Sequence, residues 1–193
     1  MPTSDSSNIS LIVEMVRKLM PSSILDVGIG CAKYGLLFRE YLDSIWCNRA
    51  FHDPATWQVN IVGLEIFPSY ITPVHTFVYD DIIIMDAYKY FEQAASQQFD
   101  LIFMGDVIEH FNMEMGKKLL QNIIDNDHLT SNGLVLISTP NFKTRINNPA
   151  RAFYGNTHEM HLCQWSEQDF IGVPHYKCMV KADKLLTVLL TKE

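Results

Sequence analysis

Short apolar runs that alternate with segments of helical periodicity constrain the fold of this chain more than any other feature of its sequence. Each run is largely apolar at consecutive positions, which is typical of a strand that is covered on both faces. Five such runs are found, at residues 24–27, 61–65, 81–85, 100–104 and 134–138. Helical periodicity is found around them, at residues 9–20, 34–45, 91–95 and 115–124. This alternation predicts a parallel sheet with helices on both faces.

The last third of the chain departs from the alternation. After a polar and aromatic segment, a short helix is predicted to begin at Ser166, because Ser166 and Asp169 have the spacing of a capping box. Residues 176–180 and 185–190 then have the pattern of two strands joined by a short turn, which predicts a hairpin. The predicted fold class is therefore α/β: a single doubly wound, mostly parallel seven-stranded sheet with helices on both faces and an antiparallel C-terminal hairpin.

Length and hydrophobic content predict one domain. The chain has 193 residues, of which 48% are hydrophobic, so it can bury one full core but is too short for two ordinary domains. We expect residues 1–193 to form this domain, with residues 1–21 as an N-terminal helix and residues 142–165 as a substrate-side insertion or lid.

Charge and cysteine spacing exclude several classes of function. The formal net charge is −7 and no basic stripe is present, so a nucleic-acid partner is not expected. No apolar stretch approaches the roughly 20 residues that span a bilayer, and the first residues lack the order of a signal peptide. The four cysteines, Cys31, Cys47, Cys163 and Cys178, lack metal-ligand spacing and are expected to be reduced thiols. These features predict a cytoplasmic protein without a membrane span.

The first four predicted strands end in acids or glycines. These residues are Asp26, Gly28 and Gly30 at the end of the first strand, then Glu65, Asp86 and Asp106. Any single carboxylate here could simply cap the helix that follows it. Since the carboxyl ends of parallel strands meet at one edge of a sheet, four such ends together indicate a ligand site.

These groups suit a nucleoside ligand. The Glu65 carboxylate could accept hydrogen bonds from both ribose hydroxyls. Asp86 could accept one from the adenine amine, while the backbone N–H of Ala87 donates to a ring nitrogen. Gly28 and Gly30 allow the backbone to approach the ligand closely, and the start of the next helix favours an anionic group.

At these residues the chain resembles the class I S-adenosylmethionine-dependent methyltransferases, and the resemblance extends from Ile24 to the final hairpin. Residues 24–30 look like the first motif of the family, and residues 63–66 look like its ribose-binding segment. Asp86 and Ala87 look like its adenine-reading pair. Residues 99–110 and 133–141 are similar to the small-molecule branch. The chain departs from many members at Ala32, where they have a third glycine.

The resemblance implies S-adenosyl-L-methionine as the cofactor, with S-adenosyl-L-homocysteine as its product. The implied cofactor-binding residues are Asp26, Gly28, Gly30, Glu65, Ile66, Asp86, Ala87 and Asp106. It also implies methyl transfer to an unidentified acceptor, for which we expect a small molecule and prefer an oxygen atom. Motifs of methyltransferases that act on adenine, amide nitrogen or cytosine C5 are missing after the fourth strand.

Two alternatives stay open at this stage. A nicotinamide-dependent oxidoreductase also begins with a strand, a glycine turn and a helix, but its third glycine would fall at Lys33, and Glu65 lies well beyond the usual distance of about 20 residues. A non-catalytic module that binds an adenosyl ligand would carry the same pocket residues, because such residues report binding and not turnover.

Two histidines are the candidates for catalysis. His110 follows Asp106 by one helical turn and could serve as a general base, although it could equally pack below the pocket. His161 is the second candidate, and with Trp165 it is expected to belong to the lid. A metal site drawn from His158, Glu159 and His161 lacks a third imidazole or a cysteine pair, so no metal is predicted.

Two arginines complete the predictions for the acceptor side. Arg145 and Arg151 lie in the expected lid and could hold an anionic acceptor, although surface arginines are more often simply solvated.

Overall fold

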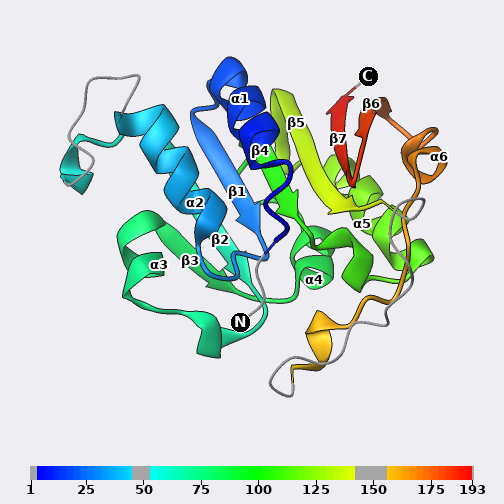
Figure 1. Ribbon diagram of the computed structural model, residues 1–193, viewed down its shortest axis with the longest axis horizontal. Helices are drawn as coiled ribbons and strands as arrows, with labels where there is room; N and C mark the ends of the chain where they lie inside the picture. The colour runs from blue at the N-terminus through cyan, green and yellow to red at the C-terminus, as the bar shows by residue number, and fades with distance from the viewer. Residues whose placement is uncertain (1–3, 45–52, 142–155, 193) are drawn as a thin grey trace.

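A computed structural model of the protein describes residues 4–44, 53–141 and 156–192 (Figure 1). Its central layer is a seven-stranded sheet in the order β3-β2-β1-β4-β5-β7-β6. The strands are Ser23–Val27 (β1), Asn60–Glu65 (β2), Asp81–Ile84 (β3), Phe99–Gly105 (β4), Leu129–Pro140 (β5), Tyr176–Ala182 (β6) and Leu185–Lys192 (β7). Strands β1 to β5 pair in parallel, whereas β7 is antiparallel to both β5 and β6. The predicted fold class is confirmed.

Helices cover both faces of the sheet (Figure 1). They are Ile9–Leu19 (α1), Lys33–Phe38 (α2), Pro73–Val78 (α3), Ala87–Glu92 (α4), Met113–Asp125 (α5) and Glu167–Phe170 (α6). Short 3-10 turns lie at Pro54–Thr56 (η2), Pro68–Tyr70 (η3), Ile108–His110 (η4) and Thr157–Glu159 (η5). None of the helices in the described ranges is long and apolar enough to cross a membrane.

The two faces of the sheet bury separate hydrophobic clusters. Leu101 and Phe103 of β4 join the cluster under α1 and α2, whereas Ile102 and Met104 join the cluster under α4 and α5. All four side chains are fully buried. Alternate residues of a strand point to opposite faces, so the part of a strand that is covered on both faces must be apolar throughout, as residues 101–104 of β4 are.

Two helical predictions are corrected by the structure, and one helix was missed. The helix expected at residues 34–45 is α-helical only as far as Phe38 and continues as the π-helix Arg39–Ser44 (η1). α4 begins at Ala87 and ends at Glu92, so Ala94 and Ala95 lie outside it. α3 was not predicted. Its start carries a capping box of Thr72 and His75, with Pro73 at the first helical position.

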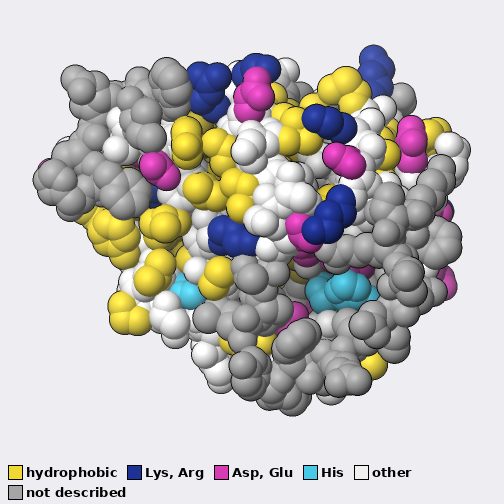
Figure 2. All heavy atoms as spheres, in the orientation of Figure 1, with side chains coloured by type: hydrophobic (Ala, Val, Ile, Leu, Met, Phe, Trp, Pro, Cys, Tyr) yellow, Lys and Arg dark blue, Asp and Glu magenta, His cyan; other side chains and the backbone are white. Residues whose placement is uncertain are grey.

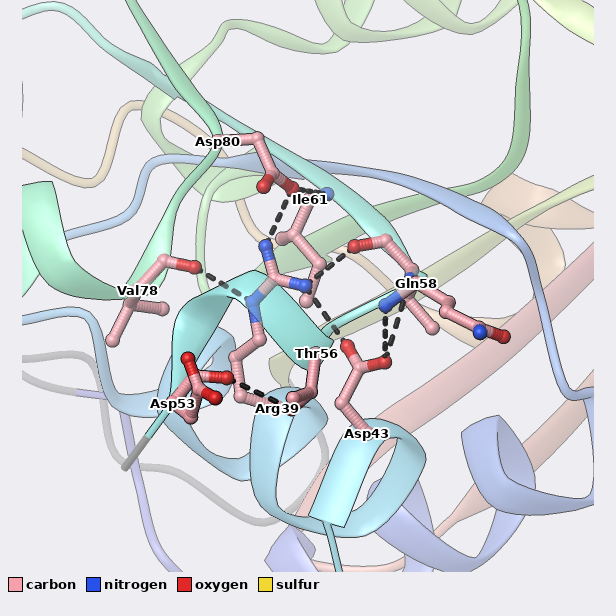
Figure 3. Close-up of polar contacts among 9 residues, drawn as sticks. Arg39, Asp43, Asp53, Thr56, Gln58, Ile61, Val78 and Asp80 are labelled. Carbon is pink, nitrogen blue, oxygen red and sulfur yellow. Dashed lines mark hydrogen bonds and ion pairs between the residues drawn. The ribbon is translucent and has the colours of Figure 1, made fainter. Parts of the chain in front are cut away.

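Arg39, the first residue of the π-helix, is fully buried between η1 and the start of β2 (Figure 3). Its Nε donates a 2.8 Å hydrogen bond to the Val78 carbonyl oxygen, and its guanidinium forms ion pairs with Asp43 and Asp80. The guanidinium carbon lies 4.5 Å from the ring centroid of Trp57. A buried guanidinium requires this many partners because its desolvation is otherwise costly. The cluster ties the helix after the glycine turn to the neighbouring strands.

Candidate functional site

A cavity of about 510 Å³ opens at the carboxyl ends of β1 to β4, within the size range of small-molecule sites. The structure brings all ten predicted site residues to its wall: Asp26, Gly28, Gly30, Glu65, Ile66, Asp86, Ala87, Asp106, His110 and His161. The sequence separates these residues by up to 135 positions, since the first is residue 26 and the last is residue 161. The parallel topology brings them together, as the strand-end argument predicts.

The glycine turn after β1 adopts backbone conformations that favour glycine. Gly28 has a φ of +72° and Gly30 has a φ of +50°. A Cβ atom on Gly28 would lie 2.6 Å from Cγ2 of Val107, which is closer than real Cβ contacts. Ala32 also has a positive φ, +62°, at the N-cap of α2. Ala32 thus adopts a left-handed conformation at the position where the sequence lacks a third glycine.

A buried histidine that was not singled out from the sequence holds this turn from α3. The backbone N–H of Thr72 donates to Nδ1 of His75 at 3.1 Å, so Nδ1 accepts and the ring proton is assigned to Nε2. Nε2 then donates to the carbonyl oxygen of Gly30 at 3.0 Å. The N–H of Gly30 donates to Oε2 of Glu65 at 3.2 Å. Both polar groups of the Gly30 backbone are therefore fixed by side chains.

Glu65, at the end of β2, is a buried carboxylate in the cavity wall. Its Oε1 accepts a 2.9 Å hydrogen bond from the N–H of Phe67, while Oε2 accepts from Gly30. Burial raises the pKa of Glu65 above its usual value, and the two backbone hydrogen bonds partly oppose that rise. A carboxylate offers about four acceptor positions, so Glu65 can accept two further hydrogen bonds from a ligand.

Asp26, in β1, is a deeply buried acid of the cavity wall, with 3% of its surface exposed. Burial raises its pKa to about 7, and the charge of Glu65 acts in the same direction. The hydrogen bond from the Tyr79 hydroxyl opposes the shift. A cationic ligand in the cavity would favour the ionised form of Asp26.

Asp86 is the N-cap of α4, where its Oδ1 accepts a 3.0 Å hydrogen bond from the N–H of Lys89. Asp86 therefore caps the helix that follows it, which is the structural role that the sequence left open. Asp86 is only half-buried, and both it and Ala87 line the cavity. The cap occupies one carboxylate oxygen, so capping and ligand binding are compatible.

Asp106, directly after β4, has a φ of +57°, a conformation that non-glycine residues rarely adopt. Its backbone N–H donates to the carbonyl oxygen of Ser138 at 2.7 Å, which holds the turn against β5. Oδ2 accepts a 3.0 Å hydrogen bond from the N–H of Asp5. The strained turn aims its carboxylate at the chain that precedes α1.

That preceding chain forms part of the cavity wall. Ser4 and Asp5 both line the cavity, and the Asp5 carboxylate pairs with Lys184 at 2.9 Å, which lowers its pKa. Asn8 is the N-cap residue of α1, but its side chain makes no cap hydrogen bond. Its Nδ2 donates instead to Oγ of Ser138 at 2.7 Å. The N-terminal segment is thus tied to the sheet beside the site.

Six of the residues from Asn156 to Leu162 also line the cavity. Nδ2 of Asn156 donates to the Tyr70 hydroxyl at 3.1 Å, and that hydroxyl donates to Oε1 of Glu159 at 3.0 Å. Nδ1 of His110 lies 3.2 Å from the carbonyl oxygen of Met160. His110 is half-buried and His161 is exposed at the cavity.

Trp165 does not belong to a lid, and that prediction is wrong. Its ring is fully buried, stacks on Phe170 with centroids 4.7 Å apart, and donates from Nε1 to the carbonyl oxygen of Ile108 at 3.2 Å. A Cβ atom on Gly116 would lie 2.5 Å from this ring, so the glycine makes room for it. Trp165 anchors the segment to the core. Arg145 and Arg151 lie outside the described residues, as does most of the predicted lid.

On the face drawn in Figure 2, lysine and arginine side chains are scattered among hydrophobic and acidic ones.

Comparison with known proteins supports the fold. No protein-family model and no curated protein sequence matches this chain. A candidate O-methyltransferase from Nostoc punctiforme shares the fold with a TM-score of 0.62 and 16% identity, over 94% of this chain and 55% of that one. This chain therefore spans little more than half the length of the Nostoc protein.

Two further structures were solved with S-adenosylhomocysteine bound. The 1,6-didemethyltoxoflavin-N1-methyltransferase of Burkholderia thailandensis gives a TM-score of 0.66 and 13% identity, over 97% of this chain and 79% of that one. A Podospora anserina methyltransferase gives a TM-score of 0.62 and 19% identity, over 99% of this chain and 80% of that one. The chain thus has the Rossmann-like fold of these methyltransferases.

Proposed function

We propose that the protein is an S-adenosylmethionine-dependent methyltransferase that acts on a small-molecule acceptor. The observation that carries the proposal is the convergence of the glycine turn, Glu65, Asp86 and Asp106 on one cavity at the carboxyl ends of four adjacent strands. The fold supports it, since neighbours of the same architecture from Burkholderia and Podospora hold S-adenosylhomocysteine.

The residues of the wall fit an adenosyl ligand. Glu65 keeps acceptor capacity for a ribose diol, because its two observed hydrogen bonds use one position on each oxygen. Ile66 and Ala87 offer apolar surface to adenine, and Asp86 offers a carboxylate oxygen to its amine. Gly28 adds no side chain to the cavity wall, and a Cβ atom there would meet Val107. Asp26, when ionised, favours the positive charges of the ligand.

When bound, S-adenosylmethionine supplies an electrophilic methyl group: an acceptor lone pair forms the new bond to carbon, the sulfur–carbon bond breaks with its electron pair on sulfur, and the acceptor releases its proton. The protein mainly supplies alignment and a water-poor cavity for such a displacement.

We prefer a hydroxyl as the acceptor, and His110 as the group that assists its deprotonation. The Met160 carbonyl oxygen beside Nδ1 favours the tautomer with the proton on Nδ1, which leaves a lone pair on Nε2. His161 lies beside it, with ring centroids 5.0 Å apart. A positioned base of this kind contributes roughly 10²- to 10⁴-fold to rate.

Calorimetric titration with S-adenosylmethionine, S-adenosylhomocysteine and NAD tests the proposal. We expect the wild type to bind both adenosyl ligands, with NAD binding absent or far weaker. Glu65→Ala should weaken binding by about 10- to 100-fold, the effect of hydrogen bonds to a charged group. Glu92→Ala, which removes an exposed glutamate outside the cavity wall, is the matched control and should bind normally.

Binding of NAD alone, or of none of the three ligands, would contradict the proposal. Conversion of S-adenosylmethionine to S-adenosylhomocysteine in the presence of hydroxylated small molecules separates an enzyme from a module that only binds the ligand.

A further inference from the structure

We propose that Glu109, His110 and His161 bind a divalent metal ion, with zinc as the first candidate, on the acceptor side of the cavity. All three residues line the cavity, and their ligand atoms lie within 4.8 Å of one another. Sequence reasoning considered His158 and Glu159 as partners of His161. The fold instead brings His161 to the end of η4, where Glu109 and His110 are found.

The donor set is the first argument. Two imidazole nitrogens and one carboxylate oxygen are the protein ligands of catalytic zinc sites that keep a fourth position open. The same set also binds iron(II) in non-haem enzymes. Zinc ligands lie about 2.0–2.2 Å from the ion and hence roughly 3.4 Å apart in a tetrahedron. The exposed side chain of His161 can make the small rotation that closes the present spacing.

The position of the carboxylate is the second argument. Only 2% of Glu109 is exposed, and its Oε2 accepts a 2.9 Å hydrogen bond from Oγ1 of Thr139. Oε1 lies 3.9 Å from Nε2 of His161, a distance too long for a hydrogen bond but short enough for one ion to bridge. A metal-binding carboxylate is commonly held by such a hydrogen bond to its second oxygen.

The backbone around the two histidines is the third argument. The Met160 carbonyl oxygen accepts from Nδ1 of His110 in the favoured tautomer, so Nε2 is the atom available to an ion. The N–H groups of Leu162 and Cys163 both donate to the carbonyl oxygen of Glu109, at 2.9 and 3.1 Å. These bonds lock the segment that carries His161 against the turn that carries the other two ligands.

The role of the ion rests on the proposed function. An ion with an open position facing the cavity would bind an acceptor oxygen and lower the pKa of its hydroxyl group, with the proton released to solvent. The substrate class is then a small molecule that presents a hydroxyl able to ligate a metal. In this arrangement His110 assists deprotonation of the acceptor through the ion that it holds, in place of taking the proton as a base.

Zinc binding to the full chain tests the proposal. After treatment with a chelator, calorimetric titration with ZnCl₂ should show about one ion per chain, and Co²⁺ should give visible absorption bands typical of a nitrogen- and oxygen-ligated site. His161→Ala should lower zinc affinity by at least about 100-fold, because even outer partners of metal ligands are worth 10- to 100-fold. Glu109→Gln should have the same effect, and it keeps an acceptor for Thr139.

His158→Ala is the matched control, because His158 is an exposed histidine of the same cavity wall outside the three ligands. We expect it to bind zinc as the wild type does. Failure of the wild type to bind zinc, or equal loss in His158→Ala and His161→Ala, would overturn the proposal and leave His161 and Glu109 as an ion pair.

Titration of S-adenosylhomocysteine into the same samples tests the metal site and the proposed methyltransferase function separately. Its affinity should be unchanged in His161→Ala. If the wild type binds S-adenosylhomocysteine but not zinc, only the metal site is refuted. If it binds zinc but no adenosyl ligand, the methyltransferase proposal fails and the metal site stands.

Discussion

The hydroxyl group of Tyr79 donates a 2.7 Å hydrogen bond to Oδ2 of Asp26 and so joins the end of α3 to the wall of the cavity. Both side chains are buried, and burial raises the pKa of each above its ordinary value. The Tyr79 ring also stacks on His75, whose Nε2 holds the carbonyl oxygen of Gly30. One short helix therefore supports both the acid and the glycine turn of the site.

Tyr79→Phe removes the donor and leaves the ring. We expect the free energy of unfolding at pH 8 to fall by about 1–3 kcal/mol, the usual contribution of a hydrogen bond to a charged group. The pKa of Asp26 should rise further, because the lost bond favours its ionised form. Urea unfolding measures the first effect, with Tyr88→Phe, a half-buried tyrosine outside the cavity wall, as control. Equal stability of both variants would contradict the account.

Asp26→Asn tests the raised pKa directly through pH-dependent stability. The folded pKa of about 7 lies above the ordinary 3.8, so the folded state holds more protons between these values. Wild-type stability should fall as pH rises through that window, by up to about 4 kcal/mol for three pKa units. The neutral amide lacks this loss, so its stability relative to wild type should rise from pH 4 to pH 8. Parallel stability curves for the two proteins would refute the assignment.

Gly28→Ala should be strongly destabilising, because the new Cβ atom meets both a positive φ and the Val107 side chain. Gly172→Ala is the matched control, since Gly172 has a φ of +83° and nothing within 4 Å of its Cβ position. We expect backbone strain to lower the free energy of unfolding by about 1 kcal/mol in Gly172→Ala. The added contact with Val107 should lower it by roughly 1–3 kcal/mol more in Gly28→Ala. Val107→Ala in the Gly28→Ala background should recover part of the difference in thermal unfolding. No recovery would exclude the contact as the cause.

Arg39→Met should destabilise the fold by about 3–5 kcal/mol, because it leaves the buried Asp43 without its cation. Lys18→Met breaks an ion pair of the same i,i+4 spacing, with Glu14, that is exposed to solvent. That change should lower the free energy of unfolding by less than about 1 kcal/mol. Denaturant unfolding of both variants gives the comparison, and similar values would argue against a structural role for the Arg39 cluster (Figure 3).

The sequence predicted the sheet and the strand-end residues well for a physical reason. Strands covered on both faces are largely apolar, so they can be recognised in the sequence. The parallel topology then brings the residues at their carboxyl ends to one edge of the sheet. Glu65 and Asp106 could therefore be placed in one site without any knowledge of their contacts. The same reasoning also separated the final hairpin from the parallel part of the sheet.

The sequence did not reveal features that depend on contacts between distant segments. α3 has only six residues, too few for a periodic pattern, although Thr72 and Pro73 form a start signal that could have indicated it. Trp165 stands in a polar segment, and its burial depends on the space above Gly116. The neighbour of His110, Glu109, gained a candidate role only when the fold brought His161 beside it.

A crystal structure of the protein with S-adenosylhomocysteine is the most direct test of the central claim. The account predicts the ligand in the cavity at the carboxyl ends of β1 to β4, with its ribose hydroxyls within hydrogen-bond distance of the Glu65 carboxylate and its adenine beside Asp86 and Ala87. Density for the ligand elsewhere on the protein, or a ribose that does not contact Glu65, would contradict it.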